Sequence, residues 1–112
     1  MGARSRRKGS QWERDLVHIF AEVFGAENVR RGLQYRDGAD AADVIAPALW
    51  IESKCGKLTN PRAALRQARE ASAGKGLLCV AVCKDDREDP FIAMSLDDFT
   101  DLLREWWARR QR

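Results

Sequence analysis

Apolar residues recur every three or four positions near the start of the chain, a spacing that predicts an amphipathic helix. The apolar positions of this helix are Trp12, Leu16, Ile19, Phe20, Val23 and Phe24. Ser10 is a residue type that caps helix N-termini, and Gly25 is one that ends helices. The pattern therefore predicts a first helix over residues 10–24. We expect the polar, basic residues 1–9 before it to form a flexible arm.

Short apolar runs separated by turn residues follow this helix and predict strands. Residues 28–35 predict a weak strand, residues 42–46 a short one and residues 48–54 a third. Pro47 lies between the last two, which indicates that they form a hairpin. Residues 77–83 are a continuous apolar run, typical of a central strand covered on both faces. Residues 91–95 predict a fifth strand.

Two further helices complete the pattern. Asn60 can cap a helix that begins at Pro61 and runs to about Ala73. Ser95 can cap a last helix, whose apolar positions are Phe99, Leu102, Leu103, Trp106 and Trp107. The order of elements is then α-β-β-β-α-β-β-α, which predicts an α/β domain with a central mixed sheet flanked by helices.

The size and the charge pattern of the chain favour a DNA-binding or RNA-binding domain without membrane spans. The 112 residues fit one domain, and no apolar run reaches the roughly 18–20 residues of a membrane span. Positive charge concentrates in residues 1–10 and 104–112, around a mildly acidic body. Basic ends of this kind favour a polyanionic partner, although short basic tails also serve solubility alone.

The cysteines and the single histidine limit the chemistry that we expect. Cys55, Cys79 and Cys83 form no CxxC pair, and their odd number predicts reduced thiols in a cytoplasmic protein. His18 is the only histidine, so we do not expect a structural zinc site.

Charged residues end the apolar strand of the predicted hairpin. Because side chains alternate along a strand, Glu52 and Lys54 share a face with Trp50, and Asp43 on the partner strand can come opposite them. Two carboxylates held close together resist joint ionisation unless a cation lies between them, and such oxygen ligands suit Mg²⁺ or Mn²⁺. The alternative is a set of surface ion pairs across the hairpin, each contributing only about 0–1 kcal/mol.

Glu13 strengthens the metal-site interpretation. On a helical wheel it falls inside the apolar arc of the first helix, so it points towards the body of the protein. It also fits a capping box, with Ser10 as the N-cap and Glu13 three residues on. The two roles do not exclude each other. His18 falls on the opposite, solvated face and is a weak candidate for catalysis.

Four segments occur in order along nearly the whole chain: RKGSQWERDL, RRGLQYRDGADAADVI, WIESK and ALRQAREA. Together they resemble the PD-(D/E)-x-K nucleases, and most of all the small enzymes of phages and archaea that are like Holliday junction resolvases. The resemblance implies a restriction-endonuclease-like domain over residues 10–112. The implied function is a Mg²⁺-dependent, structure-specific DNA endonuclease, most simply a Holliday junction resolvase. The alternatives are a related nuclease acting on flaps, nicks or duplex DNA, and an inactive DNA-binding module.

The resemblance implies roles for the residues of the hairpin. Asp43 and Glu52 would bind Mg²⁺, or Mn²⁺ as a substitute, with the main-chain carbonyl of Ser53 as a third ligand. Lys54 would position or activate the attacking water.

Two residues outside the hairpin also match the family. Glu13 would complete the site, through a water on the metal. Gln67, on the helix after the lysine strand, would reach back to the site or to DNA. Ala42 departs from the pattern, because the family has a proline before the aspartate.

Basic residues flank this site, and the resemblance also implies a homodimer. The candidates for DNA contacts are Arg7, Lys8, Arg30, Arg31, Tyr35 and Arg36. By contrast, the stripe of Arg62, Arg66 and Arg69 predicts a solvated face. Resolvases cut two strands symmetrically, which favours a two-fold dimer. Trp106 and Trp107 cannot both easily face one core, so one is a candidate dimer contact, or else it packs half-exposed on the tail.

Overall fold

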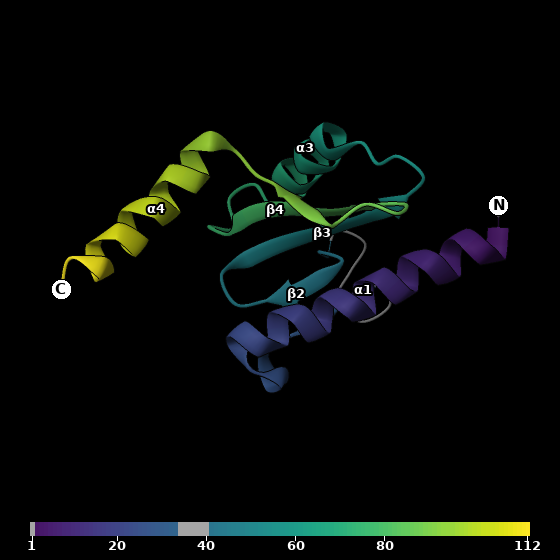
Figure 1. The fold of residues 1–112 in the computed structure, drawn as a ribbon, viewed down its shortest axis with the longest axis horizontal. Coiled ribbons are helices and arrows are strands. Elements are labelled where there is room, and N and C mark those ends of the chain that lie inside the picture. Colours follow the sequence, from purple (N-terminus) through teal and green to yellow (C-terminus); the bar gives the residue numbers. More distant parts are fainter. Residues whose placement is uncertain (1, 34–40) are drawn as a thin grey trace.

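The computed structural model describes residues 2–33 and 41–112, in which two helices cover opposite faces of a five-stranded mixed sheet (Figure 1). The predicted α/β class is confirmed. In chain order the elements are α1 (Gly2–Phe24), the short 3₁₀ helix η1 (Ala26–Asn28), β1 (Arg30–Arg31), β2 (Val44–Ala46), β3 (Leu49–Gly56), α3 (Pro61–Ala71), β4 (Leu78–Asp85), β5 (Phe91–Ala93) and α4 (Leu96–Arg110).

The strands lie in the order β1-β2-β3-β4-β5, so β3 rather than β4 occupies the middle of the sheet. β3 and β4 run parallel, and the other neighbours are antiparallel. The predicted hairpin of β2 and β3 is confirmed, with Val44 opposite Ile51 and Ala46 opposite Leu49. Its two-residue turn is Pro47 and Ala48, and Ala48 has a positive φ of 64°. This turn fixes the register that brings Asp43 next to β3.

The larger core lies between α1 and the sheet. It contains Trp12, Leu16, Val29, Val44, Ala46, Ile51, Val80 and Val82. Besides this apolar packing, the Trp12 indole donates a hydrogen bond to the Val82 carbonyl at 3.2 Å. The indole therefore anchors the middle of α1 to β4.

Helix α3 covers the opposite face of the sheet through small residues. Its buried residues, Ala64 and Ala68, belong to clusters that include Trp50, Cys79 and Cys83. Alanine lets the helix approach the strands closely, so this face of the sheet is thinly covered. Glu52 and Lys54 share a face of β3 with Trp50, so their side chains are also on the α3 side of the sheet.

The start of α1 differs from the prediction. The helix begins at Gly2 instead of residue 10, since the Arg and Lys residues before Ser10 are good helix formers. The predicted capping box is wrong, because Ser10 lies inside the helix. Lys8, early in α1, forms an ion pair with Asp86 just after β4. This contact ties the first turns of α1 to the end of the sheet where β3 and β4 finish.

The caps of the other two helices agree with the prediction. The Asn60 side chain accepts a hydrogen bond from the Ala63 amide at 3.1 Å, and Pro61 is the first residue of α3. The Ser95 hydroxyl accepts one from the Asp98 amide, also at 3.1 Å. These bonds satisfy amides that the first helical turn leaves without partners.

Helix α4 projects away from the rest of the molecule (Figure 1). None of its residues is buried, and Trp106 and Trp107 are 55% and 57% exposed, with ring centroids 6.3 Å apart. Among the described residues, no helix has both the length and the apolar character that crossing a membrane requires.

Candidate active site

The predicted convergence of Asp43 and Glu52 is present in the structure. Val44 faces Ile51, so continuing the antiparallel register by one residue places Asp43 opposite Glu52. One oxygen of the Asp43 carboxylate, Oδ2, accepts a hydrogen bond from the Ser53 amide at 2.9 Å. The Asp43 side chain therefore prolongs the pairing of β2 with β3, and its carboxylate lies beside the chain between Glu52 and Lys54.

Gly32 holds the backbone of Asp43 from the other side. Its amide donates to the Asp43 carbonyl at 2.9 Å, and the two segments pass so closely that a Cβ on Gly32 would lie 1.8 Å from the Ala42 carbonyl oxygen. Only glycine fits this contact. The predicted site residues do not include Gly32, although a glycine within a strand pattern is a signal that indicates a close backbone approach.

Glu52 is buried, with 6% of its surface exposed. Burial, and then the neighbouring Asp43 carboxylate, raise the pKa of Glu52 to about 7. A hydrogen bond from the Trp50 indole to Glu52 Oε1, at 3.3 Å, and the Lys54 ammonium act in the opposite direction. The ionised form of Glu52 is therefore unfavourable unless a cation lies close by, and without one the carboxyl group tends to hold its proton.

Trp50 lies on the face of Glu52 and Lys54, as strand alternation predicts, and it is buried at 4% exposure. Its indole nitrogen contacts Glu52, and the Lys75 ammonium lies 5.1 Å from the centre of its ring. Residues two apart on a strand share a face, which is the signal that favours this contact.

Lys54 follows Glu52 on the same face of β3 and is only partly buried. It lies opposite Cys83 of the parallel strand β4. Between the two, the Ser53 amide points towards Asp43, and in a strand the amide and carbonyl of one residue face the same neighbour. The Ser53 carbonyl is therefore on the same side of β3 as the Asp43 carboxylate.

Glu13 is partly buried, as the helical wheel predicts, but its contact in the structure is with Arg31 of β1. The Arg31 Nε and Nη2 atoms donate to Glu13 Oε1 at 3.1 and 2.9 Å. Arg31 lies opposite Val44, whose side chain is in the core under α1. The pair is thus on the α1 side of the sheet, whereas Asp43, Glu52 and Lys54 are on the α3 side.

The other predicted site residues have varied positions. Gln67 lies on α3 and is exposed, as are Arg62, Arg66 and Arg69 of the predicted solvated stripe. Tyr35 and Arg36 lie outside the described residues.

The basic residues of α1 line a depression of about 410 Å³, formed by Arg6, Arg7, Ser10, Gln11 and Arg14. This depression is in the part of α1 that Lys8 ties to the end of the sheet. Among the predicted DNA contacts, Arg7 and Arg30 are exposed, and Arg31 forms an ion pair with Glu13.

The donor set of the hairpin fits a magnesium ion. Among residues 2–33 and 41–112, no group of three or more His, Cys, Asp and Glu side chains is arranged to hold a metal. Magnesium, however, is commonly bound by one or two carboxylates together with waters and substrate phosphates. Asp43 and Glu52 supply such a pair, and the pKa of Glu52 is raised by burial first and by the neighbouring Asp43 carboxylate second, both of which a cation would offset.

The raised pKa of Glu52 has a consequence for stability. Its value of about 7 in the folded protein exceeds the ordinary value of 4.5, so the folded state binds the proton more tightly than the unfolded state. Stability therefore falls as pH rises from 4.5 to about 7 and then levels off. Without divalent ions, we expect Glu52 to lower the free energy of unfolding of the wild type by on the order of 2–3 kcal/mol between pH 4.5 and 8. In Glu52→Gln this decrease should be absent. Urea unfolding at several pH values measures it, with the exposed Glu70→Gln as control. A pH-independent difference between wild type and Glu52→Gln would contradict the assignment.

Searches of protein-family models, curated proteins and solved structures find no match to this chain.

Proposed function

We propose that this protein is a Mg²⁺-dependent DNA endonuclease with a restriction-endonuclease-like fold, acting on branched DNA as a Holliday junction resolvase does. The observation that carries the proposal is the buried Glu52 carboxylate beside Asp43, which immediately precedes the neighbouring strand β2, with Lys54 two residues further along the same face. A fold does not specify a reaction, and the chemistry proposed for this protein rests on this group of side chains.

Each residue of the hairpin has a role in this proposal. Asp43 and Glu52 would hold the ion, and the Ser53 carbonyl would be a further ligand on the same side of β3. The ion, when bound, supplies Lewis acidity towards a phosphate and lowers the pKa of water. Lys54, which is partly exposed, would orient the attacking water and balance charge on the phosphate. The Trp50 indole would keep Glu52 in place.

The basic depression on α1 supports a nucleic-acid substrate. Three arginines line it, and the Lys8–Asp86 ion pair holds this part of the helix near the ends of β3 and β4. Contacts of arginine with phosphates fix the position of DNA and carry no sequence information. Binding should weaken steeply with salt, because neutralising phosphates releases counterions.

A panel of labelled DNA substrates tests the proposal. A four-way junction, a flap, a nicked duplex and a plain duplex are incubated at one salt concentration with Mg²⁺, Mn²⁺ or EDTA. We expect cleavage that requires a divalent ion and is fastest on the junction, with symmetric cuts. Preference for flaps, nicks or duplex would replace the resolvase assignment by that of a related nuclease. Binding without cleavage in both metals would contradict the nuclease proposal.

Metal binding can be measured independently of cleavage. Adding Mg²⁺ at pH 8 should raise the melting temperature of the wild type, because an ion that binds only the folded state stabilises it. Asp43→Asn should remove most of this shift, whereas the exposed Asp89→Asn should preserve it. An equal shift in all three proteins would exclude the pair as the binding site.

A further inference from the structure

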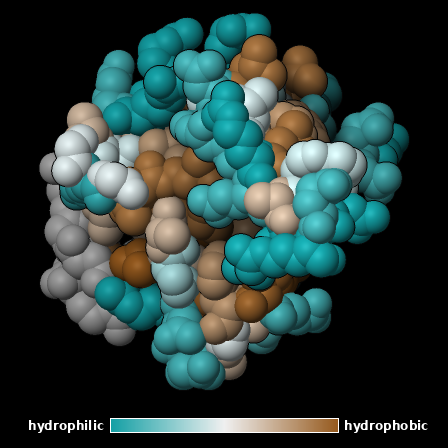
Figure 2. Space-filling model, turned by 90° about the vertical axis from the view of Figure 1, so that its left-hand side faces the viewer, coloured by the Kyte–Doolittle hydropathy of each residue, from teal (hydrophilic) through white to brown (hydrophobic). Residues whose placement is uncertain are grey.

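Helix α4 carries a large apolar surface that residues 2–33 and 41–112 leave uncovered. Together with β5 it exposes eight large apolar side chains by 40–74%: Phe91, Ile92, Leu96, Phe99, Leu102, Leu103, Trp106 and Trp107. Figure 2 shows hydrophobic side chains gathered over the middle of the face from which α4 projects, with hydrophilic ones around and across them. Exposed apolar patches of this kind usually mark an interaction site.

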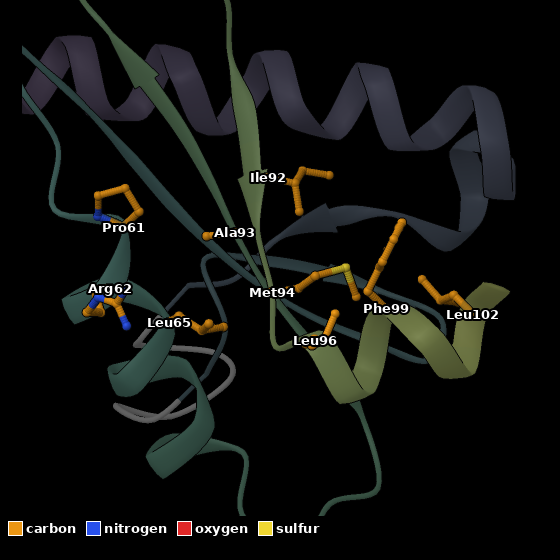
Figure 3. A pocket seen from close by; sticks show the side chains of 9 residues that line it. All are labelled: Pro61, Arg62, Leu65, Ile92, Ala93, Met94, Leu96, Phe99 and Leu102. Atoms are coloured by element: carbon orange, nitrogen blue, oxygen red, sulfur yellow. The ribbon is translucent and has the colours of Figure 1, made fainter.

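A groove runs beside the first half of α4, between this helix, β5 and α3 (Figure 3). It has a volume of about 780 Å³ and is lined by Pro61, Arg62, Leu65, Ile92, Ala93, Met94, Leu96, Phe99 and Leu102. The second half of α4, with both tryptophans, extends past this groove. One helix thus combines a groove along its first half with bulky apolar side chains on its second half.

The two ends of α4 also carry opposite charges. Asp97 and Asp98 are in its first turn, and Arg109 and Arg110 are in its last. If two copies of the helix lie antiparallel, the acidic start of each is beside the basic end of the other. The tryptophans of each copy then reach the groove of the other. The surface is therefore complementary to itself under a two-fold rotation, as an isologous contact requires.

The uncovered area is sufficient for a stable contact. A large aromatic side chain buries about 150–250 Å². Eight large side chains that are about half exposed therefore offer on the order of 700 Å² per copy, against about 800 Å² per partner in a standard interface.

We propose that α4 and the groove beside it are a dimerisation surface, on which a second copy of this chain packs with its α4 antiparallel. The contact buries the two tryptophans and the groove of each copy. A dimer is also what the symmetric cuts of the proposed function require, but the surface is argued without the hairpin residues, so association and cleavage can fail separately.

The first test measures association of the full chain by sedimentation velocity from 0.1 to 100 μM. We expect a dimer at about 10 μM, within the affinity range of interfaces of this size. Trp106→Glu should raise the dissociation constant at least about 30-fold, because buried tryptophans dominate interface energies. Val23→Glu, at a valine of α1 that is 73% exposed, is the matched control and should leave association unchanged. A monomer at 100 μM, a larger assembly, or a dimer insensitive to Trp106→Glu would overturn the proposal.

A charge-reversal experiment tests the antiparallel arrangement. Asp97→Lys with Asp98→Lys should weaken the dimer about tenfold, and Arg109→Glu with Arg110→Glu should do the same. The four changes together should restore it. Helix-dipole effects cannot produce this rescue, since both pairs of changes oppose the dipole and the combined variant is the least favourable for the helix. If the fourfold variant associates no better than either pair, the antiparallel arrangement is excluded.

Discussion

We expect that replacing Lys54 by methionine will lower the proposed Mg²⁺-dependent DNA cleavage by roughly three orders of magnitude, within the range that a positioned proton-transfer group contributes. Methionine keeps most of the length of the side chain and removes the charge. Lys54 lies on the same face as Glu52 and is only partly buried, so the change creates no large cavity. We therefore expect the loss in the rate constant of single-turnover cleavage rather than in DNA affinity.

The matched control is Lys57→Met. Lys57 is exposed and follows the end of β3, so it lies just outside the strand that carries the site. Cleavage by this variant should stay within about twofold of wild type. If Lys54→Met cleaved at the wild-type rate while Asp43→Asn was inactive, the carboxylates would remain in the proposed site and Lys54 would not.

We expect that replacing Trp12 by alanine will lower the free energy of unfolding by about 3–5 kcal/mol, the range for large aromatic residues in a core. Trp12 is 8% exposed, and its indole donates a hydrogen bond from α1 to the Val82 carbonyl of β4. The change removes both the packing and the hydrogen bond that anchor α1. A domain of this size has only about 5–15 kcal/mol in total, so the variant should be close to unfolding.

Two further substitutions separate the packing of Trp12 and its hydrogen bond from the effect of an exposed position on the same helix. Trp12→Phe keeps an aromatic ring and should cost about 1–2 kcal/mol for the lost hydrogen bond and the smaller ring. Val23→Ala, on the exposed side of the same helix, should change stability by less than about 0.5 kcal/mol. Urea unfolding at one protein concentration measures all three. A loss below 1 kcal/mol in Trp12→Ala would show that α1 is not held through this residue.

Strand periodicity was sufficient to predict the centre of the candidate site. The alternation from Trp50 to Lys54 defines one face, and Pro47 locates the turn that brings Asp43 opposite Glu52. Both features are local, so the sequence contains them. The hydrogen bond of Trp50 to Glu52 joins two residues of that face, but a shared face does not by itself show that the indole nitrogen reaches the carboxylate.

The arrangement around the hairpin depends on contacts between distant segments, which periodicity does not specify. The helical wheel correctly turns Glu13 towards the protein, yet it does not say which face of the sheet α1 covers. The partner of Glu13 is Arg31, eighteen residues away. The apolar positions of α4 likewise predict an amphipathic helix without predicting what covers it. The predicted start of α1 at Ser10 was wrong. Serine is a good capping residue, but the basic residues before Ser10 also favour a helix, and the helix begins at Gly2.

The four tryptophans lie in three separate environments: Trp12 in the core between α1 and the sheet, Trp50 beside Glu52, and the pair on α4. Variants that retain one of these environments at a time would turn fluorescence into three separate assays. Trp12 would report unfolding, and Trp50 would report an ion reaching Glu52. The pair on α4 would report association, through the blue shift that accompanies loss of solvent. Folding, metal binding and dimerisation could then be followed optically, without attaching any external label.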